Sequence, residues 1–242
     1  MQNMKKNIKY LFNYFFPHTC VFCLETKNCL DRDLCEECRK ELPLKKPGCK
    51  ICLADIANKN NIALLAKLCG NCIKNPPLFD QLFAPYSYQN PIDYLITKLK
   101  FNKKLIFANL LGKLMVEYLA AIYKNRQKPQ IIIPIPLHKK RLRERGFNQA
   151  LEISKPISKN LQIKIDRFSC QRVKNTVMQS LLPAKEREQN IKNAFAVTNQ
   201  FKFTHVAVID DVFTTGNTIR EFCKTLKKSG VQKIDVWCVA RG

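Results

Sequence analysis

Two adjacent carboxylates near the carboxyl end of the chain have the type and spacing of a ligand site. Asp210 and Asp211 follow four consecutive hydrophobic residues, 206–209, which predict a strand buried on both faces. A turn leading into a predicted helix comes next, and its residues are Thr214, Thr215, Gly216, Asn217 and Thr218. The backbone amides of such a turn point at one spot, and the helix dipole adds positive potential there. The stretch therefore predicts a cradle for a phosphate beside two acids.

The acids and the turn together narrow the class of ligand. Carboxylates accept hydrogen bonds from vicinal sugar hydroxyls, and threonine hydroxyls donate to phosphate oxygens. A compound with a phosphate on one side and a diol on the other is a ribose 5-phosphate. The alternative is that the acids simply end the strand, but two consecutive acids at the end of a buried strand are costly without a ligand or partner.

Eight of the twelve cysteines form four C-x2-C pairs. The pairs are Cys20 with Cys23, Cys35 with Cys38, Cys49 with Cys52, and Cys69 with Cys72. Two intervening residues let both sulfurs face one ion, so each pair predicts half of a tetrahedral zinc site. Because four thiolates leave no open coordination position, we expect two structural Zn2+ ions that fold a segment too small for its own core.

The spacing of the cysteines leaves their pairing open. Sequential pairing gives one site from the first four cysteines and a second from the last four, and an interleaved arrangement uses the same residues. Disulfides are disfavoured because we find no export signal, and redox chemistry because four tandem copies lie outside a βαβ pattern. The remaining cysteines are expected to be core or incidental residues: Cys29, Cys170, Cys223 and Cys238.

After the cysteines, the sequence alternates between strand and helix patterns. Strands are predicted at 82–88, 131–136, 163–170, 206–209 and 233–240, and helices from residue 91 and at 105–123, 148–160, 183–195 and 216–229. The alternation predicts an α/β fold with a mostly parallel sheet flanked by helices and a ligand site at the carboxyl ends of its strands. The proline-containing linker 73–80 divides the chain into a zinc ribbon at 1–80, with an N-terminal lead-in helix, and a sheet domain at 81–242.

The chain of 242 residues is strongly basic, with 42 Lys and Arg against 19 Asp and Glu and a formal net charge of +23. The excess predicts an anionic partner, and most of it lies in residues 81–242, with 29 bases against 11 acids. Compositional bias is the alternative, since 31 lysines stand against 11 arginines. No apolar run reaches the length of a membrane span, and the aromatic run at 10–16 lacks the signal-peptide pattern, so we expect a cytoplasmic protein.

The stretch 206–218 resembles the phosphoribosyl-pyrophosphate (PRPP) motif of type I phosphoribosyltransferases, which has four hydrophobic residues, two acids and a Thr-Thr-Gly turn. Three further stretches, 134–138, 141–149 and 172–187, narrow the resemblance to the ComF family. A double zinc ribbon at the amino end is also similar to that family, and the likeness covers about residues 11–241. The resemblance implies a type I phosphoribosyltransferase-like domain preceded by a small zinc-ribbon domain.

The resemblance also implies roles for individual residues. Asp210 and Asp211 would bind the ribose hydroxyls, and the turn 214–218 would hold the 5-phosphate. The implied pyrophosphate site and lid consist of Leu137, His138, Lys139, Lys140, Arg141, Arg143, Arg145, Arg172 and Lys174, of which Lys139, Lys140 and Arg141 join the two acids as the implied catalytic set. Mg2+ would bridge pyrophosphate and ribose oxygens, and the lid would exclude water.

One departure from the resemblance concerns the acceptor. Enzymes that salvage 6-oxopurines carry an Asp three places after the second acid, where this chain has Thr214, so purine salvage is disfavoured and the acceptor is unidentified.

The resemblance implies a role in DNA uptake and natural transformation, with a helicase-like competence partner. Two interpretations of the fold follow. One is a PRPP-dependent phosphoribosyltransferase. The other is a module that binds single-stranded DNA without turnover, for which Tyr86, Tyr88 or Phe147 would provide stacking faces.

Overall fold

The computed structural model describes residues 19–26, 29, 33–56, 67–176, 189–198 and 201–242. The contacts divide the chain into two compact units, Met1–Leu42 and Pro43–Gly242. The first unit contains the short helix α2 (Glu36–Lys40). Cys49, Cys52, Cys69 and Cys72 belong to the same unit as the sheet. The domain boundary that the sequence places at residue 80 stays a prediction. The lead-in helix expected at the amino end lies outside the described residues.

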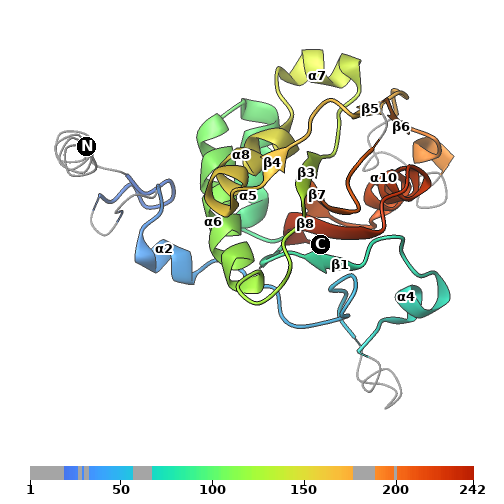
Figure 1. Ribbon diagram of the computed structural model, residues 1–242. Coiled ribbons are helices and arrows are strands. Elements are labelled where there is room, and N and C mark those ends of the chain that lie inside the picture. The colour runs from blue at the N-terminus through green and yellow to red at the C-terminus, as the bar shows by residue number, and fades with distance from the viewer. Residues whose placement is uncertain (1–18, 27–28, 30–32, 57–66, 177–188, 199–200) are drawn as a thin grey trace, which may run out of the picture. The chain divides into compact units, whose positions relative to one another are not determined.

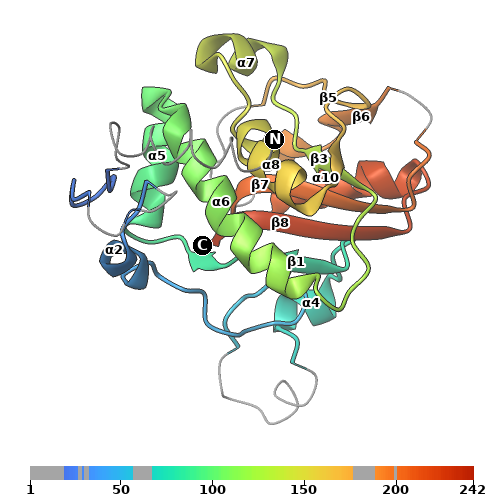
Figure 2. The same cartoon turned by 60° about the vertical axis from the view of Figure 1, so that its left-hand side comes forward.

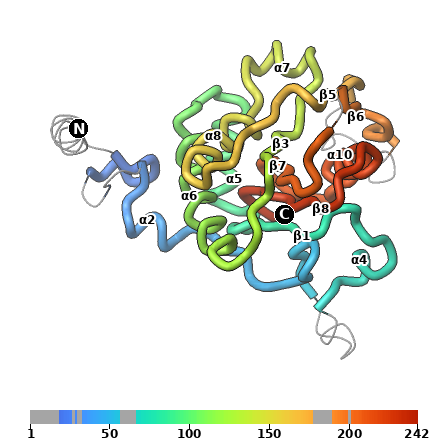
Figure 3. Tube along the Cα trace, in the orientation of Figure 1, coloured from blue at the N-terminus to red at the C-terminus, as the bar shows by residue number. Residues whose placement is uncertain are grey.

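The second unit is built on a parallel sheet with the strand order β1-β8-β7-β3-β4. Its strands are β1 (Gln81–Phe83), β2 (Tyr86–Ser87), β3 (Ile131–Pro134), β4 (Lys164–Ile165), β7 (His205–Phe213) and β8 (Lys233–Arg241), with β2 also pairing with β8. Figure 3 shows β1, from the first half of the chain, beside β8 at its end. Strands β7 and β8 are almost wholly buried, as expected for central strands covered on both faces.

Helices cover both faces of this sheet (Figure 1). On one side lie α5 (Ile92–Asn102), α6 (Leu105–Ile122) and α8 (Gln149–Leu161), and on the other lies α10 (Asn217–Lys228). The residues that α10 buries are spaced three and four apart, which is the pattern of an amphipathic helix: Ile219, Phe222, Cys223 and Leu226. Two short helices, α4 (Gly70–Lys74) and α7 (Lys139–Arg145), precede β1 and follow β3.

Among the described residues, α6 is the one helix whose length and composition would allow it to cross a membrane. Eight of its residues are buried, and Figure 2 shows the helix lying beside the sheet. Gly112 permits a close crossing with α8, because a Cβ there would lie 2.6 Å from the Ile153 carbonyl oxygen and 2.7 Å from Pro156 Cγ. The helix therefore packs as a core element of the second unit.

The structure confirms the predicted fold class, a mostly parallel sheet with flanking helices. Four of the predicted helices, from residue 91 and at 105–123, 148–160 and 216–229, correspond to α5, α6, α8 and α10. The predicted strand 206–209 continues to Phe213 in β7. The four cysteines outside the C-x2-C pairs are all buried, as expected.

Other elements differ from the prediction. The predicted strand 82–88 is divided into β1 and β2, with Pro85 in the gap, because proline cannot donate a ladder hydrogen bond. The predicted strand 163–170 is likewise divided, into β4 and β5 (Cys170–Arg172), and β5 pairs antiparallel with β6 (Phe195–Val197) in a separate two-stranded sheet. The predicted helix 183–195 lies partly outside the described residues, and its last residue begins β6.

The segment implied to be the pyrophosphate loop also differs, since most of it is helical. His138 caps α7, with its Nδ1 accepting a hydrogen bond from the Lys140 amide at 3.3 Å. Gly146 ends the helix with a φ of 86°. The basic residues of this segment are therefore presented by a short helix with a cap at each end.

Candidate functional site

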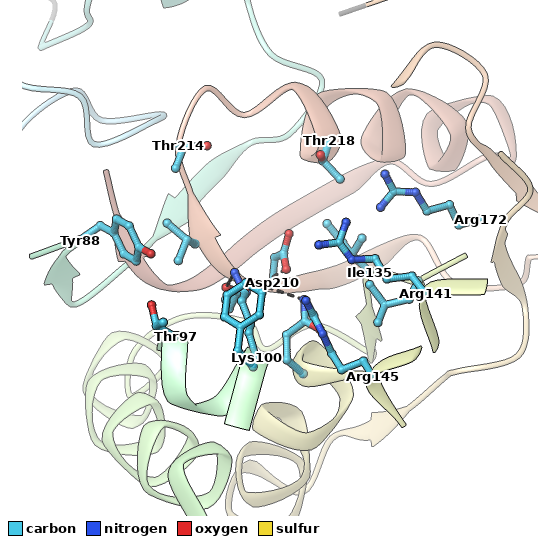
Figure 4. Close-up of a pocket in the computed structure, with 15 residues that line it drawn as sticks. Tyr88, Thr97, Lys100, Ile135, Arg141, Arg145, Arg172, Asp210, Thr214 and Thr218 are labelled. Atoms are coloured by element: carbon cyan, nitrogen blue, oxygen red, sulfur yellow. Dashed lines mark hydrogen bonds and ion pairs between the residues drawn. The ribbon is translucent and has the colours of Figure 1, made fainter. Parts of the chain in front are cut away.

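A cavity of about 380 Å³ lies where the sequence predicts a ligand site, beyond the carboxyl ends of β3 and β7. We call it the ligand cavity. Its charged lining consists of four cations and two acids: Lys100, Arg141, Arg145, Arg172, Asp210 and Asp211. Figure 4 shows the labelled charged side chains converging from α5, α7, β5 and β7, with Thr214 in the turn before α10 and Thr218 in the first turn of that helix. The cavity is therefore polar and contains charges of both signs.

The two acids of the cavity have different surroundings. Asp211 is 4% exposed, and its carboxylate forms an ion pair with Lys100 of α5. Gln149 Nε2 donates to Asp211 Oδ1 at 3.3 Å, and Arg145 Nη1 donates to Gln149 Oε1 at 2.5 Å. Asp210 accepts a hydrogen bond from the Asp211 amide at 2.9 Å. A chain of polar contacts thus fixes Asp211, and Asp210 is the less engaged carboxylate.

This difference separates the proton affinities of the two acids. Burial, followed by the charge of Asp211, raises the pKa of Asp210 well above its usual range. Burial also opposes ionisation of Asp211, but Lys100, Asp210 and Gln149 stabilise the carboxylate and hold the pKa of Asp211 below its usual value. The pKa of Lys100 is raised because the attraction of Asp211 and Asp210 outweighs burial. Asp211 is therefore the ionised member of the pair.

The turn between β7 and α10 requires glycine. Gly216 has a φ of 79°, in the left-handed region, and a Cβ there would lie 2.4 Å from Cζ of the Phe213 ring. Gly216 is the residue before α10 and has no side chain with which to cap that helix end. Because the first amides of a helix attract anions, the turn has the geometry of a phosphate cradle.

Arginines crowd the other side of the ligand cavity. Burial is the main cause that lowers the pKa of Arg145 and of Arg172, and the neighbouring charge of Arg141 lowers both further. The Nε of Arg172 is buried and has no hydrogen-bond partner within the described parts of the chain. Crowded cations with a buried free donor favour an anionic ligand.

A second cavity of about 370 Å³ shares Lys100, Phe101, Arg141 and Arg145 with the first. We call it the basic cavity. Its further lining residues are Lys103, Lys140, Glu144, Asn175 and Thr176, so five cations stand against one acid. Phe101 is 62% exposed and lines both cavities. The ligand cavity is thus continued by a basic surface with an exposed aromatic ring.

The cysteines form two clusters in the sequential pairing. The sulfurs of Cys20, Cys23, Cys35 and Cys38 lie within 4.8 Å of one another, and so do those of Cys49, Cys52, Cys69 and Cys72. Individual Sγ–Sγ distances are 3.6 Å for Cys23 and Cys35 and 3.5 Å for Cys52 and Cys69. Zn–S bonds of about 2.3 Å in a tetrahedron place sulfurs about 3.8 Å apart, so both clusters fit Zn2+.

One thiol in each cluster is predisposed to ionise. Burial opposes this, but backbone amides outweigh it and lower the pKa of Cys20 to about 6 and that of Cys49 to about 7. Burial and neighbouring thiols raise the pKa of Cys38 and Cys72. A metal ion entering such a cluster displaces the remaining protons.

Comparison with known proteins identifies the family. Residues 11–73 match the double zinc ribbon domain. Over 234 residues the chain is 36% identical to competence protein F of Haemophilus influenzae, and the match covers 94% of this chain and 98% of that protein. The chain belongs to the ComF family.

Other relatives are similar over most of their length. DNA utilization protein YhgH of Escherichia coli is 31% identical over 86% of this chain and 96% of its own. Competence protein ComFC of Bacillus subtilis is 24% identical over 83% of this chain and 80% of its own. Among solved structures, glutamine PRPP amidotransferase from B. subtilis has a TM-score of 0.35 at 14% identity, covering 53% of this chain and 25% of that one.

In this ComF-family chain, eight of the residues implied to bind ligand line the ligand cavity: Leu137, Arg141, Arg145, Arg172, Asp210, Asp211, Thr214 and Thr218. Lys140 lines the basic cavity. The others line neither of these two cavities: His138, Lys139, Arg143, Lys174, Thr215, Gly216 and Asn217. Lys174 instead donates to the Lys192 carbonyl at 2.7 Å. The roles of all these residues remain predictions.

Sequence reasoning missed several residues that the fold brings to the ligand cavity. Thr97, Lys100 and Phe101 of α5 line it, and so does Gln149 of α8. The spacing of the α5 residues, three and four apart, places them on one helix face and was the available signal. Of the aromatic residues considered for stacking, Tyr86 is 6% exposed and too buried for that role, whereas Tyr88 lines the cavity.

Proposed function

We propose that this ComF-family protein binds PRPP together with Mg2+ in the ligand cavity and acts in DNA uptake and natural transformation. The observation that carries the proposal is the convergence of two carboxylates, the turn before α10 and three arginines on one cavity. The names of the relatives, competence protein F and DNA utilization protein, support the cellular role. A cytoplasmic location and a helicase-like partner remain predictions from the sequence.

The parts of the ligand cavity match the parts of PRPP. The ionised Asp211 suits a ribose hydroxyl, with Asp210 beside it for the second hydroxyl. The 5-phosphate fits the turn, where Thr214 and Thr218 line the cavity. The pyrophosphate fits the arginines, because a guanidinium donates charge-assisted hydrogen bonds to phosphate oxygens, and the buried Nε of Arg172 has no partner among the residues that the structure describes.

The same residues suit transfer chemistry. Mg2+ keeps several waters and is usually bound through substrate phosphates with at most one or two carboxylates, so a cavity that holds Asp210 and Asp211 beside its arginines fits the ion without a dedicated cage of acids. When bound, Mg2+ would neutralise charge on the pyrophosphate. Arg141, Arg145 and Arg172 would bind the departing pyrophosphate and stabilise its charge as an acceptor nucleophile replaces it at C1 of the ribose.

We also propose one structural Zn2+ in each four-cysteine cluster. The close approach of the four sulfurs and the match of residues 11–73 to a double zinc ribbon domain support this. Four thiolates leave no open coordination position, so these ions would contribute to folding and have no role in catalysis.

The test of the PRPP proposal is calorimetric titration of the full-length protein with PRPP in the presence of Mg2+. We expect the wild-type protein to bind and the double variant Asp210→Asn with Asp211→Asn to lose binding, because it lacks both carboxylates. A matched control is Glu36→Gln with Glu37→Gln, an adjacent acid pair on α2, which should bind as the wild type does. Transformation frequency should fall sharply only in the aspartate variant. An unchanged transformation frequency in the aspartate variant would show that the ligand cavity is not needed for transformation.

A second candidate function is binding of single-stranded DNA, and the basic cavity favours it. Its five cations suit a phosphate backbone, and exposed Phe101 offers a face on which a base can stack. The two cavities share Lys100, Phe101, Arg141 and Arg145, so PRPP and a single strand would bind at adjoining and partly overlapping parts of one surface.

A further inference from the structure

Arg241, the last residue of β8, joins three segments of the second unit. Its Nη1 donates to the carbonyl oxygens of Phe213 at 3.2 Å and Thr214 at 2.9 Å. Its Nε donates to the carbonyl oxygen of Cys52 at 3.1 Å. The guanidinium also lies over the Phe213 ring, 5.1 Å from its centroid. One side chain therefore contacts both the start of the turn between β7 and α10 and the backbone of the segment 49–52, which we call the Cys52 knuckle.

The knuckle that Arg241 contacts belongs to the second cysteine cluster, which packs in the core of the sheet unit. Cys49, Cys52 and Cys72 of this cluster are buried in the same hydrophobic core as Phe79 and Leu82. The carbonyl of Ile51 accepts a hydrogen bond from the Leu82 amide of β1 at 2.7 Å. Two consecutive carbonyls of the knuckle thus accept hydrogen bonds from the two strands β1 and β8.

The contacts of Arg241 extend to the glycine of the turn. The Phe213 ring below the guanidinium is the same ring that leaves no space for a Cβ at Gly216. The Gly242 amide donates a further hydrogen bond to the Phe213 carbonyl at 2.9 Å. Because packed and hydrogen-bonded groups shift together, displacement of Arg241 would move Phe213 and open the turn.

We propose that Arg241 is a positioning residue that couples the second cysteine cluster to the turn before α10. A metal ion in that cluster fixes the Cys52 knuckle, the knuckle orients the guanidinium, and the guanidinium holds the turn in its anion-binding conformation. The planar fork of arginine suits this role, because its donors keep a fixed angle to one another, whereas a lysine offers a single point of contact. The inference rests on the proposed function in two respects, namely a phosphate bound at the turn and a Zn2+ held by the second cluster.

The first test measures the turn without any ligand, by hydrogen–deuterium exchange of the peptide covering 210–218. We expect exchange to be at least about tenfold faster in Arg241→Ala and in Cys69→Ser, and less so in Arg241→Lys. Cys38→Ser is the matched control, since it disrupts only the first cluster, and its turn should exchange as in the wild type. Wild-type exchange in Arg241→Ala, or in a folded Cys69→Ser, would overturn the coupling.

The second test uses ribose 5-phosphate as the probe and the Cys38→Ser protein, which keeps only the second cluster intact. Coupling is reciprocal in binding free energy, so at equilibrium the probe should raise the affinity of the second cluster for Zn2+, measured by competition with a chelator, by about fivefold, and the effect should vanish when Arg241→Ala is added. Binding of the probe without any change in the affinity for Zn2+ would overturn the inference. Absence of binding in the wild-type protein, with the exchange result as expected, would instead overturn the proposed function and leave the coupling supported.

Discussion

At the scale of single residues, the two adjacent aspartates of the ligand cavity differ in how readily they ionise, because their surroundings differ. Asp210 and Asp211 are adjacent on β7, but only Asp211 has the ion pair with Lys100 and the hydrogen bond from Gln149. Two like charges side by side in a buried site repel, so the partnered carboxylate ionises and its neighbour retains its proton more readily. A ligand that supplies hydroxyls or a cation would relieve this repulsion.

The protonation of Asp210 predicts a pH dependence of stability. Because its pKa is raised in the folded state, Asp210 contributes stability below its unfolded pKa of about 3.9, and this contribution is lost as the pH rises through the folded value. The depressed pKa of Asp211 has the opposite sign, and its contribution is lost only as the pH falls through its folded value. As the pH rises above about 4, we therefore expect the wild type to lose this contribution to stability and Asp210→Asn to show no such loss.

Urea unfolding at several pH values measures this effect. We expect Asp210→Asn to be more stable than the wild type by about 1 kcal/mol at pH 7.5, because its amide oxygen can still accept the Asp211 amide. The control is Asp93→Asn on α5, which lies outside the ligand cavity and should keep the wild-type dependence. If the free energy of unfolding changed with pH in the same way in Asp210→Asn and in the wild type, Asp210 would not be the titrating group.

At the scale of elements, the turn between β7 and α10 carries the phosphate-type geometry, and Gly216 decides its shape. We expect Gly216→Ala to lower the free energy of unfolding by about 1–3 kcal/mol, because the new Cβ meets both an unfavourable φ and the Phe213 ring. The same change should weaken binding of ribose 5-phosphate. Urea unfolding and calorimetry measure the two effects.

Gly230→Ala is the matched control for that prediction. Gly230 also has a positive φ, 97°, but apart from its chain neighbours no atom of the described residues lies within 4 Å of its Cβ position. Its substitution introduces backbone strain alone and should leave ribose 5-phosphate binding unchanged. Equal losses of stability and of binding in both variants would mean that the contact with Phe213 does not shape the turn.

The elements that the sequence predicts well are those whose signal is local. The apolar run 206–209 and the three-and-four spacing in α10 predict β7 and α10, because each pattern lies within a single element. The pairing of β5 with β6 could not be predicted in this way. It joins Cys170 to Val197 across 27 positions and is formed by tertiary contact between short segments that show little periodicity.

The same distinction applies to the candidate site. Asp210, Asp211 and the turn are contiguous, so one stretch of sequence indicates them. Lys100 lies more than a hundred positions earlier and reaches Asp211 only because α5 packs beside the carboxyl end of β7. Arg241 resembles any strand-terminal arginine until the fold places the Cys52 and Thr214 carbonyls beside it.

At the scale of the whole molecule, most of the net charge of +23 lies in residues 81–242, where 29 bases stand against 11 acids. The structure locates part of this excess of positive charge in the basic cavity, which has five cations and adjoins the ligand cavity. A cation that meets phosphate in a complex releases counterions, whereas a cation that reflects composition alone does not. Salt dependence therefore distinguishes the two origins of the charge.

We predict that the affinity for single-stranded DNA falls with salt, with log affinity decreasing by about 0.7 per neutralised phosphate for each unit of log salt. Lys103→Ala with Lys140→Ala should reduce this slope by about 1.4, because both residues line the basic cavity. Phe101→Ala should weaken binding about tenfold at an unchanged slope, because stacking is independent of counterions. Fluorescence anisotropy measures both quantities, and Phe168→Ala, which removes a ring 68% exposed outside both cavities, is the control. If the affinity did not depend on salt, the excess positive charge would reflect amino-acid composition and not DNA binding.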